Sequence, residues 1–504
     1  MNKKILTNNF EKKISELKKK KKSIVMCHGV FDLIHIGHIE YFKEAKRYGD
    51  ILIVSVTSDK FVKKGINRPT FNIADRLIAL SSLNYVDYVV ESNNDSAVKN
   101  ISIIKPNYYV KGNDYKNLSK DLSKKIILEK RTVEKFGGKL VFTESELNSS
   151  SKLLFSNNLI FSEGIKNYFL RLKKKFSFNE LEKTIKKIQK LKILIIGDTI
   201  IDKYVFCETV GKASKDPMLV IKEKETKKFI GGAASIAQNC LELSKNVTLM
   251  TKIGKKNSNY KFFKKRINGC KLNIINCDNK FSNEKLRYVD EASNSKILGV
   301  YDVGLSSSDK FDNFQIESLK KEIKKYDVVI VYDYFHGCLN TKLSRLIINN
   351  NKNHFVNCQM NSSNRGISNI KSYKNSNCLI INLAELRFEM RDGNSAPEFL
   401  IKKFAKNYSI EKVVVTLGSD GVLMYFKKTN KIIKTPGFAN RVTDKVGAGD
   451  IIQLVLSLFF STNKNYELGL IAASMFAAKS VENYGNENII NTQELMKFFS
   501  TFLK

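Results

Sequence analysis

Residues 23–38 read Ser-Ile-Val-Met-Cys-His-Gly-Val-Phe-Asp-Leu-Ile-His-Ile-Gly-His. The apolar run Ser23–Cys27 predicts a short buried strand, the following glycine predicts a turn, and the apolar spacing over Ile36–Tyr48 predicts a helix. A helix that starts just after a strand and a turn presents free backbone N–H groups and its positive end to a phosphate. The sequence therefore predicts an anion-binding strand–turn–helix unit near the N-terminus.

Three of the five histidines of the chain, His28, His35 and His38, fall within this stretch. Two imidazoles at the start of a helix can donate hydrogen bonds to an α-phosphate whose negative charge grows in the transition state. Such a transfer depends on positioning and charge stabilisation and needs no covalent intermediate. The alternatives are a metal site, which lacks a third ligand in a typical spacing, and a chance cluster. We predict that His35 and His38 are catalytic.

Strand and helix patterns alternate through the rest of the first third of the chain. The predicted elements are strands at Ile51–Val56, Tyr88–Glu91, Tyr108–Val110 and Lys139–Thr143, and helices at Ile73–Leu83 and Leu118–Phe136. This alternation predicts a parallel sheet with helices on both faces. A helical pattern follows at Gly164–Lys190. A second α/β region then begins, with strands predicted at Ile193–Ile196, Val328–Val331, Leu379–Ile381 and Val413–Thr416.

The composition is that of a globular protein without a membrane span. Of the 504 residues, 42% are apolar, and no run approaches the roughly 20 apolar residues that cross a membrane. The start, Met1–Lys22, is basic but lacks the apolar core of a signal peptide. We therefore expect a cytoplasmic protein that does not enter the membrane. The cysteines stand singly, without a C-x-x-C pair, so neither a zinc site nor a disulfide framework is predicted.

The net charge of +36 comes mostly from lysines that are spread along the whole chain. One interpretation is nucleic-acid binding, which would require a focused basic patch. We favour a compositional bias of the genome, because the chain is also rich in Asn and Ile and has only 5 Pro and no Trp. We expect no nucleic-acid partner, although the positive field favours anionic substrates such as nucleotides and sugar phosphates.

Three further motifs follow the histidines. They are Asn67-Arg68-Pro69 with Arg76, then Val110-Lys111-Gly112-Asn113-Asp114-Tyr115, and then Ser149-Ser150-Ser151-Lys152-Leu153-Leu154. Hydroxyls and N–H groups at a helix start form an anion site, and an ordinary N-cap run is the alternative for the serines. Together with the H-x-G-H sequence, these motifs resemble, over about residues 23–160, the H-x-G-H nucleotidylyltransferase superfamily. That superfamily includes cytidylyltransferases and the adenylyltransferase half of the bifunctional heptose kinase/adenylyltransferase.

The resemblance implies a Rossmann-like domain with a parallel sheet that transfers a nucleotidyl group. The residues that it implies for binding the nucleotide and its phosphates are His28, Gly29, Phe31, Gly37, Lys63, Arg76, Lys111, Ser149, Ser150 and Ser151. Lys63 and Lys64 have a second interpretation as solvated surface charges. We expect Asp32 to fix the turn or meet the substrate rather than to act as a base.

The segment Val446-Gly447-Ala448-Gly449-Asp450 precedes a strongly apolar helical run. Small residues at a helix start free backbone N–H groups to form an anion hole, and an Asp just after them can accept a proton from a substrate hydroxyl. The alternative is a tight turn whose acidic residue caps the helix. We predict that Asp450 is a catalytic base and that Gly447, Ala448 and Gly449 form the anion hole.

Four other motifs accompany this segment in the C-terminal region. They are Gly197-Asp198 with Asp202, Gly231-Gly232-Ala233-Ala234-Ser235, Asn382 with Glu385, and Val415-Thr416-Leu417-Gly418. Together they resemble the ribokinase-like (PfkB) carbohydrate kinases over about residues 191–490, and most of all the kinase half of the heptose enzyme. The resemblance implies a ribokinase-like α/β domain with a small β lid. It assigns the sugar to Asp198, Asp202, Gly231, Gly232 and Ser235, the nucleotide to Thr416 and Gly418, and Mg²⁺ organisation to Asn382 and Glu385.

The chain departs from the kinase pattern at four places. Ser235 stands where the family commonly has Asn, Val446 where it has Thr, and His336 where it has Lys. A family Asp-Pro-Lys reads Asn357-Cys358-Gln359 here. Because these regions contact sugar and phosphate, the acceptor can differ from a heptose phosphate, or the domain can be a binding or dimerisation module. His336 can equally be a structural surface residue or a site residue.

We therefore predict four segments: a basic arm (1–22), a nucleotidylyltransferase domain (23–162), a helical linker (163–190) and a PfkB-like kinase domain (191–504). The heptose enzyme has the reverse order. The leading hypothesis is nucleotidyl transfer from ATP or CTP to a sugar 1-phosphate, together with phosphorylation of a sugar or sugar phosphate by ATP and Mg²⁺. The product would feed surface polysaccharide assembly. The alternative is an active cytidylyltransferase beside a non-catalytic kinase-like module. Both superfamilies often form dimers, so a homodimer is one expected assembly.

Overall fold

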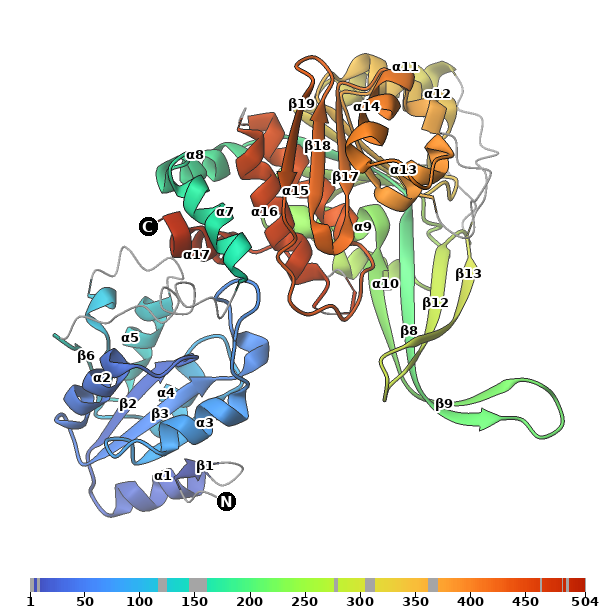
Figure 1. Ribbon diagram of the computed structural model, residues 1–504. Helices are drawn as coiled ribbons and strands as arrows, with labels where there is room; N and C mark the ends of the chain where they lie inside the picture. The colour runs from blue at the N-terminus through green and yellow to red at the C-terminus, as the bar shows by residue number, and fades with distance from the viewer. Residues whose placement is uncertain are drawn as a thin grey trace. The chain divides into compact units, whose positions relative to one another are not determined.

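The computed structural model describes residues 4–6, 10–116, 125–144, 161–275, 280–303, 313–360, 370–462, 465–482, 484–485 and 489–503. The chain divides into two compact units (Figure 1). Unit 1 consists of Met1–Phe178 and Gln493–Lys504, and unit 2 consists of Asn179–Thr492. The last helix, α17 (Thr492–Leu503), therefore groups with unit 1, although the sequence assigned these residues to the kinase domain.

Unit 1 is built on a six-stranded sheet in the order β1-β4-β3-β2-β5-β6, in which every pair of neighbours is parallel. The strands are β1 (Ile5–Leu6), β2 (Ile24–Gly29), β3 (Ile51–Thr57), β4 (Tyr88–Ser92), β5 (Tyr108–Lys111) and β6 (Lys139–Phe142). The helices are α1 (Phe10–Lys19), α2 (Ile36–Lys46), α3 (Ile73–Ser81), α4 (Val98–Ile104), α5 (Lys125–Lys135) and α7 (Glu163–Lys173). The predicted parallel sheet is confirmed.

Helices cover both faces of this sheet because successive residues of a strand point to opposite sides. Val25 and Cys27 of β2 pack in the core that also holds residues of α2 and α3. Ile24 and Met26, between and beside them, pack in a second core with residues of α1, α4 and α5. The carboxyl end of β2, where the histidine stretch begins, is therefore held from both sides.

The N-terminal residues are part of this fold rather than a separate arm. β1 pairs with β4, and α1 buries Ile14 and Leu17 in the core. These two positions, three residues apart, lie on one face of a helix whose other positions are mostly Lys and Glu. The helix is therefore amphipathic, and its apolar side packs on the sheet.

The predicted helical linker forms two helices. The first is α7, in unit 1, and the second is α8 (Phe178–Ile188), which lies almost wholly in unit 2. In unit 1, the ring of Phe169 in α7 meets the rings of Phe161 and Phe498, at centroid distances of 5.4 and 5.7 Å. Phe498 belongs to α17, which explains why the last residues of the chain group with unit 1.

Unit 2 contains a nine-stranded sheet in the order β11-β10-β7-β14-β15-β16-β17-β18-β19. The strands are β7 (Ile193–Gly197), β10 (Val247–Thr251), β11 (Lys271–Ile274), β14 (Val328–Asp333), β15 (His354–Cys358), β16 (Cys378–Asn382), β17 (Lys412–Thr416), β18 (Val422–Phe426) and β19 (Lys431–Thr435). Only β18 and β19 run antiparallel to their neighbours. The four strands predicted for this region form β7, β14, β16 and β17.

Helices again cover the sheet on both faces. Residues of α12 (Thr341–Asn350), α13 (Leu383–Met390) and α14 (Pro397–Asn407) share one core with the strands. On the other face, α9 (Gly232–Cys240) and α15 (Ala448–Thr462) contact β14, and α15 pairs with α16 (Tyr466–Ser480). The described helices also include α10 (Tyr260–Arg266) and α11 (Asn313–Ile323).

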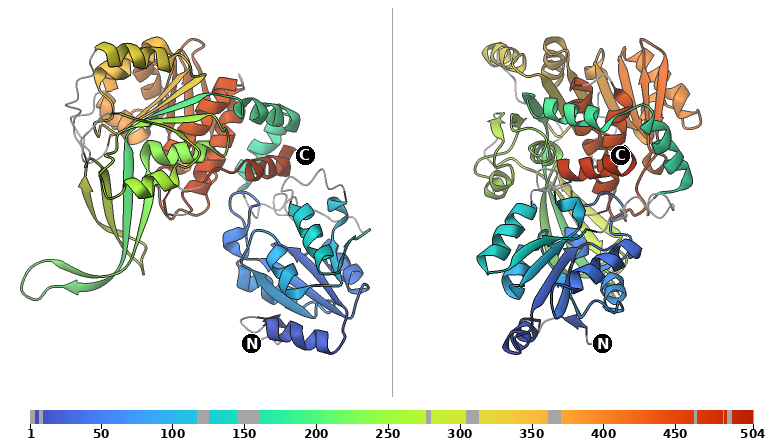
Figure 2. Two further views of the ribbon diagram at one scale, coloured as in Figure 1. Left: turned by 180° about the vertical axis from the view of Figure 1, so that it is seen from behind. Right: turned by 90° about the vertical axis from the view of Figure 1, so that its left-hand side faces the viewer.

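A second sheet of unit 2 forms the predicted β lid. Its order is β13-β12-β8-β9, with β8 at Thr199–Lys212, β9 at Leu219–Gly231, β12 at Asn283–Asp290 and β13 at Lys296–Asp302. β8 starts almost directly after β7, so the lid continues the first strand of the large sheet. Figure 2 shows β8 and β9 running on beyond the other two strands as a ribbon.

Among the helices that the structure describes, none has the length and apolar character needed to cross a membrane.

Candidate active sites

The histidine pair lies at the start of α2, at the carboxyl end of β2. His35 is the N-cap of α2, and its Nδ1 accepts a hydrogen bond from the backbone N–H of Gly37 at 3.2 Å. His38 follows one turn later, and the two imidazole centroids lie 4.0 Å apart. The local sequence folds this way because an N-cap residue satisfies one of the free N–H groups of the first turn. The two predicted catalytic side chains are thus adjacent at a helix N-terminus.

Both imidazoles of this pair are neutral at physiological pH in the free protein. Burial lowers the pKa of His38 most, and together with the charges of His35 and Lys64 it brings that pKa to about 3. Burial also lowers the pKa of His35. A neutral imidazole carries one N–H donor, so each histidine can offer one hydrogen bond to a phosphate oxygen.

The turn before α2 is shaped by Gly29 and Phe31. Phe31 has a φ of +50°, in the left-handed region, and its ring folds back over the strand end. A Cβ on Gly29 would lie 2.9 Å from Cζ of that ring, so a larger residue would displace it. The ring also meets His38 edge-on, at 5.4 Å between centroids. Gly29 and Phe31 therefore shape the wall beside the catalytic pair.

His28 is half-buried beside this turn, in a network of polar side chains. Its Nδ1 shares a 2.9 Å hydrogen bond with Oγ of Ser55, and Asn100 donates to the same hydroxyl at 2.9 Å. Burial lowers the pKa of His28 to about 3. The network joins β2 to β3 at the strand end that precedes the predicted catalytic pair.

The structure gives Arg76 a different role from the expected phosphate contact. Its side chain is 1% exposed and donates to the carbonyl oxygens of Val30 and Thr57 at 2.6 and 2.9 Å. It also donates to Asp59 at 2.5 Å and to the carbonyl of Phe71 at 3.0 Å. These bonds join the loops that follow β2 and β3, so Arg76 stabilises the arrangement of these two loops. The motif alone does not distinguish this role from a ligand contact.

Asp32 fixes the same turn, as expected. Its carboxylate accepts from Nε of Arg68 at 2.5 Å and from the backbone N–H groups of Thr70 and Phe71 at 2.8 and 3.0 Å.

Lys111 lies at the end of β5 in a buried ion pair. Its Nζ is 3.4 Å from Oε2 of Glu129 and donates to the carbonyl of His28 at 3.3 Å. Burial opposes ionisation of Glu129, but the charge of Lys111, together with hydrogen bonds from Ala97 and Tyr109, lowers the pKa of Glu129 to about 2. Lys63, in contrast, forms an exposed pair with Asp95 at 3.2 Å. The predicted phosphate ligands Ser149, Ser150 and Ser151 lie outside the described residues.

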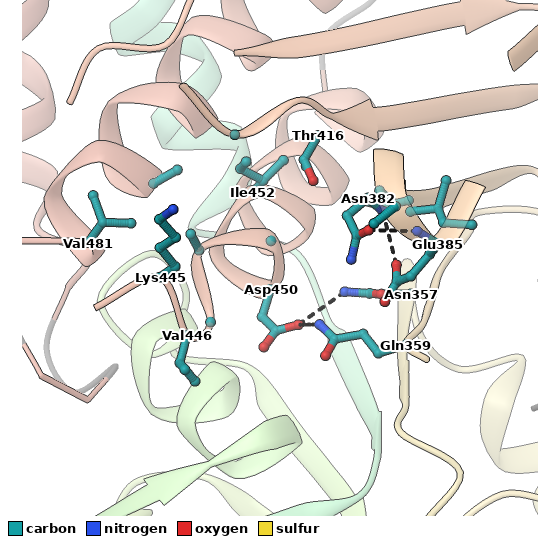
Figure 3. A pocket seen from close by; sticks show the side chains of 18 of the residues that line it. Asn357, Gln359, Asn382, Glu385, Thr416, Lys445, Val446, Asp450, Ile452 and Val481 are labelled. Carbon is teal, nitrogen blue, oxygen red and sulfur yellow. Dashed lines mark hydrogen bonds between the residues drawn. The ribbon is translucent and has the colours of Figure 1, made fainter. Parts of the chain in front are cut away.

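Unit 2 holds a cavity of about 850 Å³ at the carboxyl ends of β16 and β17, beside the first turn of α15 and under the lid (Figure 3). This volume is in the range of ligand sites. Most of the predicted kinase residues line it: Asp202, Gly232, Asn382, Glu385, Thr416, Gly418, Gly447, Ala448, Gly449 and Asp450.

Asp450, the predicted base, stands in the first turn of α15 with both carboxylate oxygens engaged. Oδ1 accepts from Asn357 at 3.0 Å and Gln359 at 2.8 Å, and Oδ2 accepts from the hydroxyl of Tyr334 at 2.7 Å. Figure 3 shows the two amides reaching Asp450. Burial raises the pKa of Asp450 to about 7, although Tyr334 and Lys285 lower it. The carboxylate is therefore a base of near-neutral strength.

The turn before α15 is held by a buried aspartate. Asp444 accepts from the hydroxyl of Tyr204 at 2.7 Å, from Lys296 at 2.6 Å and from the backbone N–H of Val446 at 3.0 Å. Gly447 then adopts a φ of +82°, a conformation that glycine takes without strain. Gly447, Ala448 and Gly449 line the cavity, so the helix start that is predicted to form an anion hole lies at its wall.

Asn382 and Glu385 form a capping box at the start of α13, on the cavity wall. The side chain of Asn382 accepts from the N–H of Glu385 at 2.8 Å, and the N–H groups of Asn382 and Met360 donate to Glu385 at 3.0 and 3.1 Å. Burial raises the pKa of Glu385 to about 7. Each carboxylate oxygen accepts one of these bonds and has a second lone pair, so the residue fits a Mg²⁺ ion that arrives with a nucleotide. Across the described ranges, no cluster of three or more His, Cys, Asp or Glu side chains could hold a metal ion.

Three predicted sugar contacts do not line the cavity. Asp198 is fully buried and accepts from the backbone N–H groups of Tyr334, His336 and Cys338, at 2.9, 3.2 and 2.9 Å. It therefore holds the loop after β14. Ser235 is buried inside α9. Gly231 packs directly against Asp202, because a Cβ on this glycine would lie only 2.1 Å from Oδ2 of Asp202.

The reason for these corrections is that a strand end or a helix start places some residues toward the ligand and their neighbours toward the core. The interpretation of His336 as a surface residue is also wrong, because it is completely buried.

The sequence analysis missed the lid residues of the cavity. Lys285 and Arg287 of β12 and Tyr301 of β13 line it. Along β12 buried and half-buried residues alternate strictly, and both cations are on the buried side. Two basic residues at alternate positions of a strand lie on the same face. Because buried cations need partners, this pattern could have indicated that Lys285 and Arg287 belong to a site.

Both units are α/β folds, and in each the predicted catalytic residues stand in the first turn of a helix at the carboxyl edge of a parallel sheet. The family of pfkB carbohydrate kinases matches residues 190–493, and the cytidylyltransferase-like family matches residues 26–154. The chain belongs to the pfkB family of carbohydrate kinases and carries a cytidylyltransferase-like domain ahead of it.

Curated relatives match a smaller part of the chain. "Bifunctional protein HldE" of Campylobacter jejuni subsp. doylei is 44% identical over 118 residues, which are 22% of this chain and 26% of that protein. The protein of the same name from Aliarcobacter butzleri is 41% identical over 129 residues, 25% of this chain and 27% of its own. The chain thus spans about a quarter of the length of these relatives.

A solved structure of a candidate ribokinase from Agrobacterium tumefaciens shares the fold of the C-terminal part. The TM-score is 0.50 with 12% sequence identity, and the match covers 62% of this chain and 98% of that one.

Proposed function

We propose that the chain is a bifunctional enzyme with a carbohydrate kinase site and a nucleotidyltransferase site. The kinase phosphorylates a sugar phosphate with MgATP, and the transferase converts a sugar 1-phosphate and ATP or CTP into an NDP-sugar and pyrophosphate. The observation that carries the proposal is Asp450, a buried carboxylate of near-neutral pKa of about 7, in the helix turn that opens on a cavity of about 850 Å³.

In the kinase step, Asp450 accepts the proton of the acceptor hydroxyl while that oxygen attacks the γ-phosphorus of ATP. The N–H groups of Gly447, Ala448 and Gly449 and the positive end of α15 stabilise the charge on the phosphoryl group in transit. A base whose pKa is about 7 is ionised often enough at neutral pH, and it is basic enough to take the proton.

The lid favours an acceptor that carries an anionic group. Arg287 is paired with Asp202, whereas Lys285 lies against the rings of Tyr301 and Tyr334, at 5.3 and 5.9 Å from their centroids. Burial lowers the pKa of Lys285, so its charge is costly in the empty cavity. A phosphate or carboxylate on the acceptor would offset that cost, and we propose a sugar phosphate.

Mg²⁺ enters this scheme with the nucleotide as part of the substrate. Asn382 and Glu385 are the residues that would organise it, through the free lone pairs of the carboxylate or through water. The ion would shield the charge of the β- and γ-phosphates.

In the transferase step, His35 and His38 donate hydrogen bonds to the α-phosphate as the sugar phosphate attacks it. The start of α2 adds its free N–H groups and its positive end. His28, Gly29, Phe31, Gly37 and Lys111 surround the nucleotide or position the pair, and Lys63 is within the same loop region. Serines 149, 150 and 151 remain proposed ligands of the outer phosphates.

The biological setting is a further part of the proposal. An activated sugar of heptose type would serve surface polysaccharide assembly. Both reactions consume nucleoside triphosphates, which are made in the cytoplasm, so we propose that the enzyme works there. A homodimer is the assembly that we propose, and nucleic acid and membrane are not among the partners.

The alternative is an active cytidylyltransferase beside a kinase-like module that does not catalyse. It is favoured by Ser235, which is buried in α9, and by the Val446 and Asn357-Cys358-Gln359 departures from the kinase pattern. Two measurements distinguish the active kinase from the non-catalytic module. One is binding of MgATP to the full chain and to its Asp450→Asn variant, and the other is ADP release in the presence of acceptors. Nucleotide binding with ADP release supports a kinase, and no binding at this site supports the module.

The test of the whole proposal measures two products from the purified full chain. Pyrophosphate release is measured with ATP or CTP against a panel of sugar 1-phosphates and glycerol phosphate, and ADP release is measured with ATP against a panel of sugar phosphates. Pyrophosphate with one nucleotide and one acceptor would name the transferase substrates. Absence of both products with every pair would contradict the proposal.

A further inference from the structure

Three neutral side chains converge on the carboxylate of Asp450, and we call them the donor trio: Tyr334, Asn357 and Gln359. Asn357 is in β15 and Gln359 is one residue beyond that strand, so their side chains leave the strand on the same face. Both amides donate to Oδ1, at 3.0 and 2.8 Å. Tyr334, after β14, donates to Oδ2 at 2.7 Å.

The two carboxylate oxygens are not equally occupied. Each oxygen has two lone pairs, so Oδ1 with two amide donors is saturated. Oδ2 receives one hydrogen bond from a described residue and keeps one lone pair open. The helix backbone is held in place as well, because the hydroxyl of Tyr332 donates to the carbonyl oxygen of Asp450 at 2.9 Å.

The donors are neutral, which matters for a base. An ammonium group at the same distance would stabilise the ionised carboxylate and lower its pKa, typically by about 1–3 units. Amide and hydroxyl donors fix the orientation with a much smaller loss of basicity. Lys285, which lines the same cavity, lowers the pKa of Asp450 through its charge, without a hydrogen bond or ion pair between these two residues.

We propose that the donor trio positions the carboxylate of Asp450 and directs the acceptor proton to Oδ2. This inference rests on the proposed kinase function. In the step, the O–H bond of the acceptor breaks and its proton goes to Oδ2. The acceptor oxygen forms a bond to the γ-phosphorus, the bond from that phosphorus to the β–γ bridging oxygen breaks, and ADP leaves with the electron pair. The proton later passes to solvent.

Two substitutions with opposite effects test the inference. Tyr334→Phe removes the one donor on Oδ2, so the pKa of Asp450 is expected to rise. Gln359→Lys places an ammonium at Oδ1, so that pKa is expected to fall by about 1–3 units. Gln189→Lys is the matched control, because it adds the same charge at an exposed position of unit 2.

The first readout needs no substrate. Infrared difference spectra of the full chain are recorded over a pH titration, and the carboxylic acid band that disappears in Asp450→Asn reports this group alone. We expect the band of the wild type to titrate near pH 7. It should move to higher pH in Tyr334→Phe and to lower pH in Gln359→Lys, and it should stay in place in Gln189→Lys. A band that does not respond to either substitution overturns the inference.

The second readout is the pH profile of kcat for ADP release with the acceptor found above. Activity should rise with pH through the pKa of Asp450, because the ionised form is the base. The rise should shift in the same directions as the infrared band. Gln359→Ala, which removes one orienting bond, should lower kcat roughly 10²-fold while leaving KM for ATP nearly unchanged.

An unchanged kcat in Gln359→Ala and Tyr334→Phe would overturn the inference while leaving the kinase function in place. If the wild type transfers no phosphoryl group at all, the proposed function fails, and the infrared titration still decides whether the donor trio acts on Asp450.

Discussion

At the scale of single residues, each unit concentrates its chemistry in the first turn of one helix. His35 caps α2 and His38 follows in its first turn, while Asp450 is the third residue of α15. In both places the free N–H groups of the helix can stabilise phosphate charge, and the side chains add hydrogen-bond donors in one case and a base in the other. A substitution in one site should therefore leave the activity of the other site unchanged.

Substitution of these residues should separate the two activities. His35→Ala or His38→Ala should lower nucleotidyl transfer by roughly 10²–10³-fold, because a donor to the developing charge is lost. Kinase activity should stay at the wild-type level. Asp450→Asn should do the reverse, and pyrophosphate and ADP release by the same preparations provide the measurement. Equal loss of both activities in folded variants would refute the two-site scheme.

Asp333 makes the stability of unit 2 depend on pH. Burial and the nearby charge of Asp198 raise its pKa to about 7, although the hydroxyl of Tyr373 lowers it. Because the folded-state pKa is raised, the contribution to stability is fully present below the unfolded pKa near 4 and is lost as pH rises through about 7.

We therefore expect the Tm of unit 2 to fall between pH 5 and pH 8 and to fall less steeply in Asp333→Asn. Calorimetry of the full chain at several pH values measures both slopes, and Asp392→Asn, at an exposed turn, serves as the control. Equal slopes for wild type and Asp333→Asn would show that this carboxyl does not titrate in that range.

At the scale of elements, α1 packs on the sheet of unit 1, although the sequence predicted a basic arm here. Ile14 is 3% exposed and packs in the core beside residues of α4 and α5. Ile14→Ala should lower the free energy of unfolding by about 2–5 kcal/mol, since a buried branched side chain is replaced by a cavity. Lys12→Ala, at an exposed position of α1, should change it by less than about 0.5 kcal/mol.

Denaturant unfolding of the full chain measures both variants. An Ile14→Ala variant as stable as the wild type would mean that α1 is only loosely attached to the sheet.

At the scale of the whole molecule, helix α17 groups with unit 1, although it follows unit 2 in the sequence. Phe498 of α17 is 4% exposed, and its ring lies edge-on to Phe161 and Phe169, 6.3 and 5.7 Å away. Phe498→Ala should lower the stability of unit 1 by about 3–5 kcal/mol and leave that of unit 2 unchanged.

Calorimetric unfolding, with nucleotidyl transfer and ADP release followed on heating, assigns the loss to one unit. Ser500→Ala on the same helix is the control. Loss of kinase activity at lower temperature in Phe498→Ala, with transferase activity unaffected, would refute the assignment of α17 to unit 1.

The sequence by itself determined the elements and the two helix-start motifs. The strands predicted at 193–196 and 413–416 form β7 and β17, and the histidines and Asp450 stand where their local patterns indicated. This works because strand and helix patterns and capping groups involve residues only a few positions apart. The resemblance to known families added the lid.

Only the tertiary structure decided which of the neighbouring residues face a ligand. Asp198 and Arg76 form hydrogen bonds with loops that are distant in the sequence. Helix α17 belongs to unit 1, whose other residues end at position 178. Lys285 reaches the cavity because β12 pairs with β8, and the first aligned residues, Asn283 and Ile200, are 83 positions apart in the chain. Such contacts depend on chain pairings between distant residues, and no local pattern of side chains encodes them.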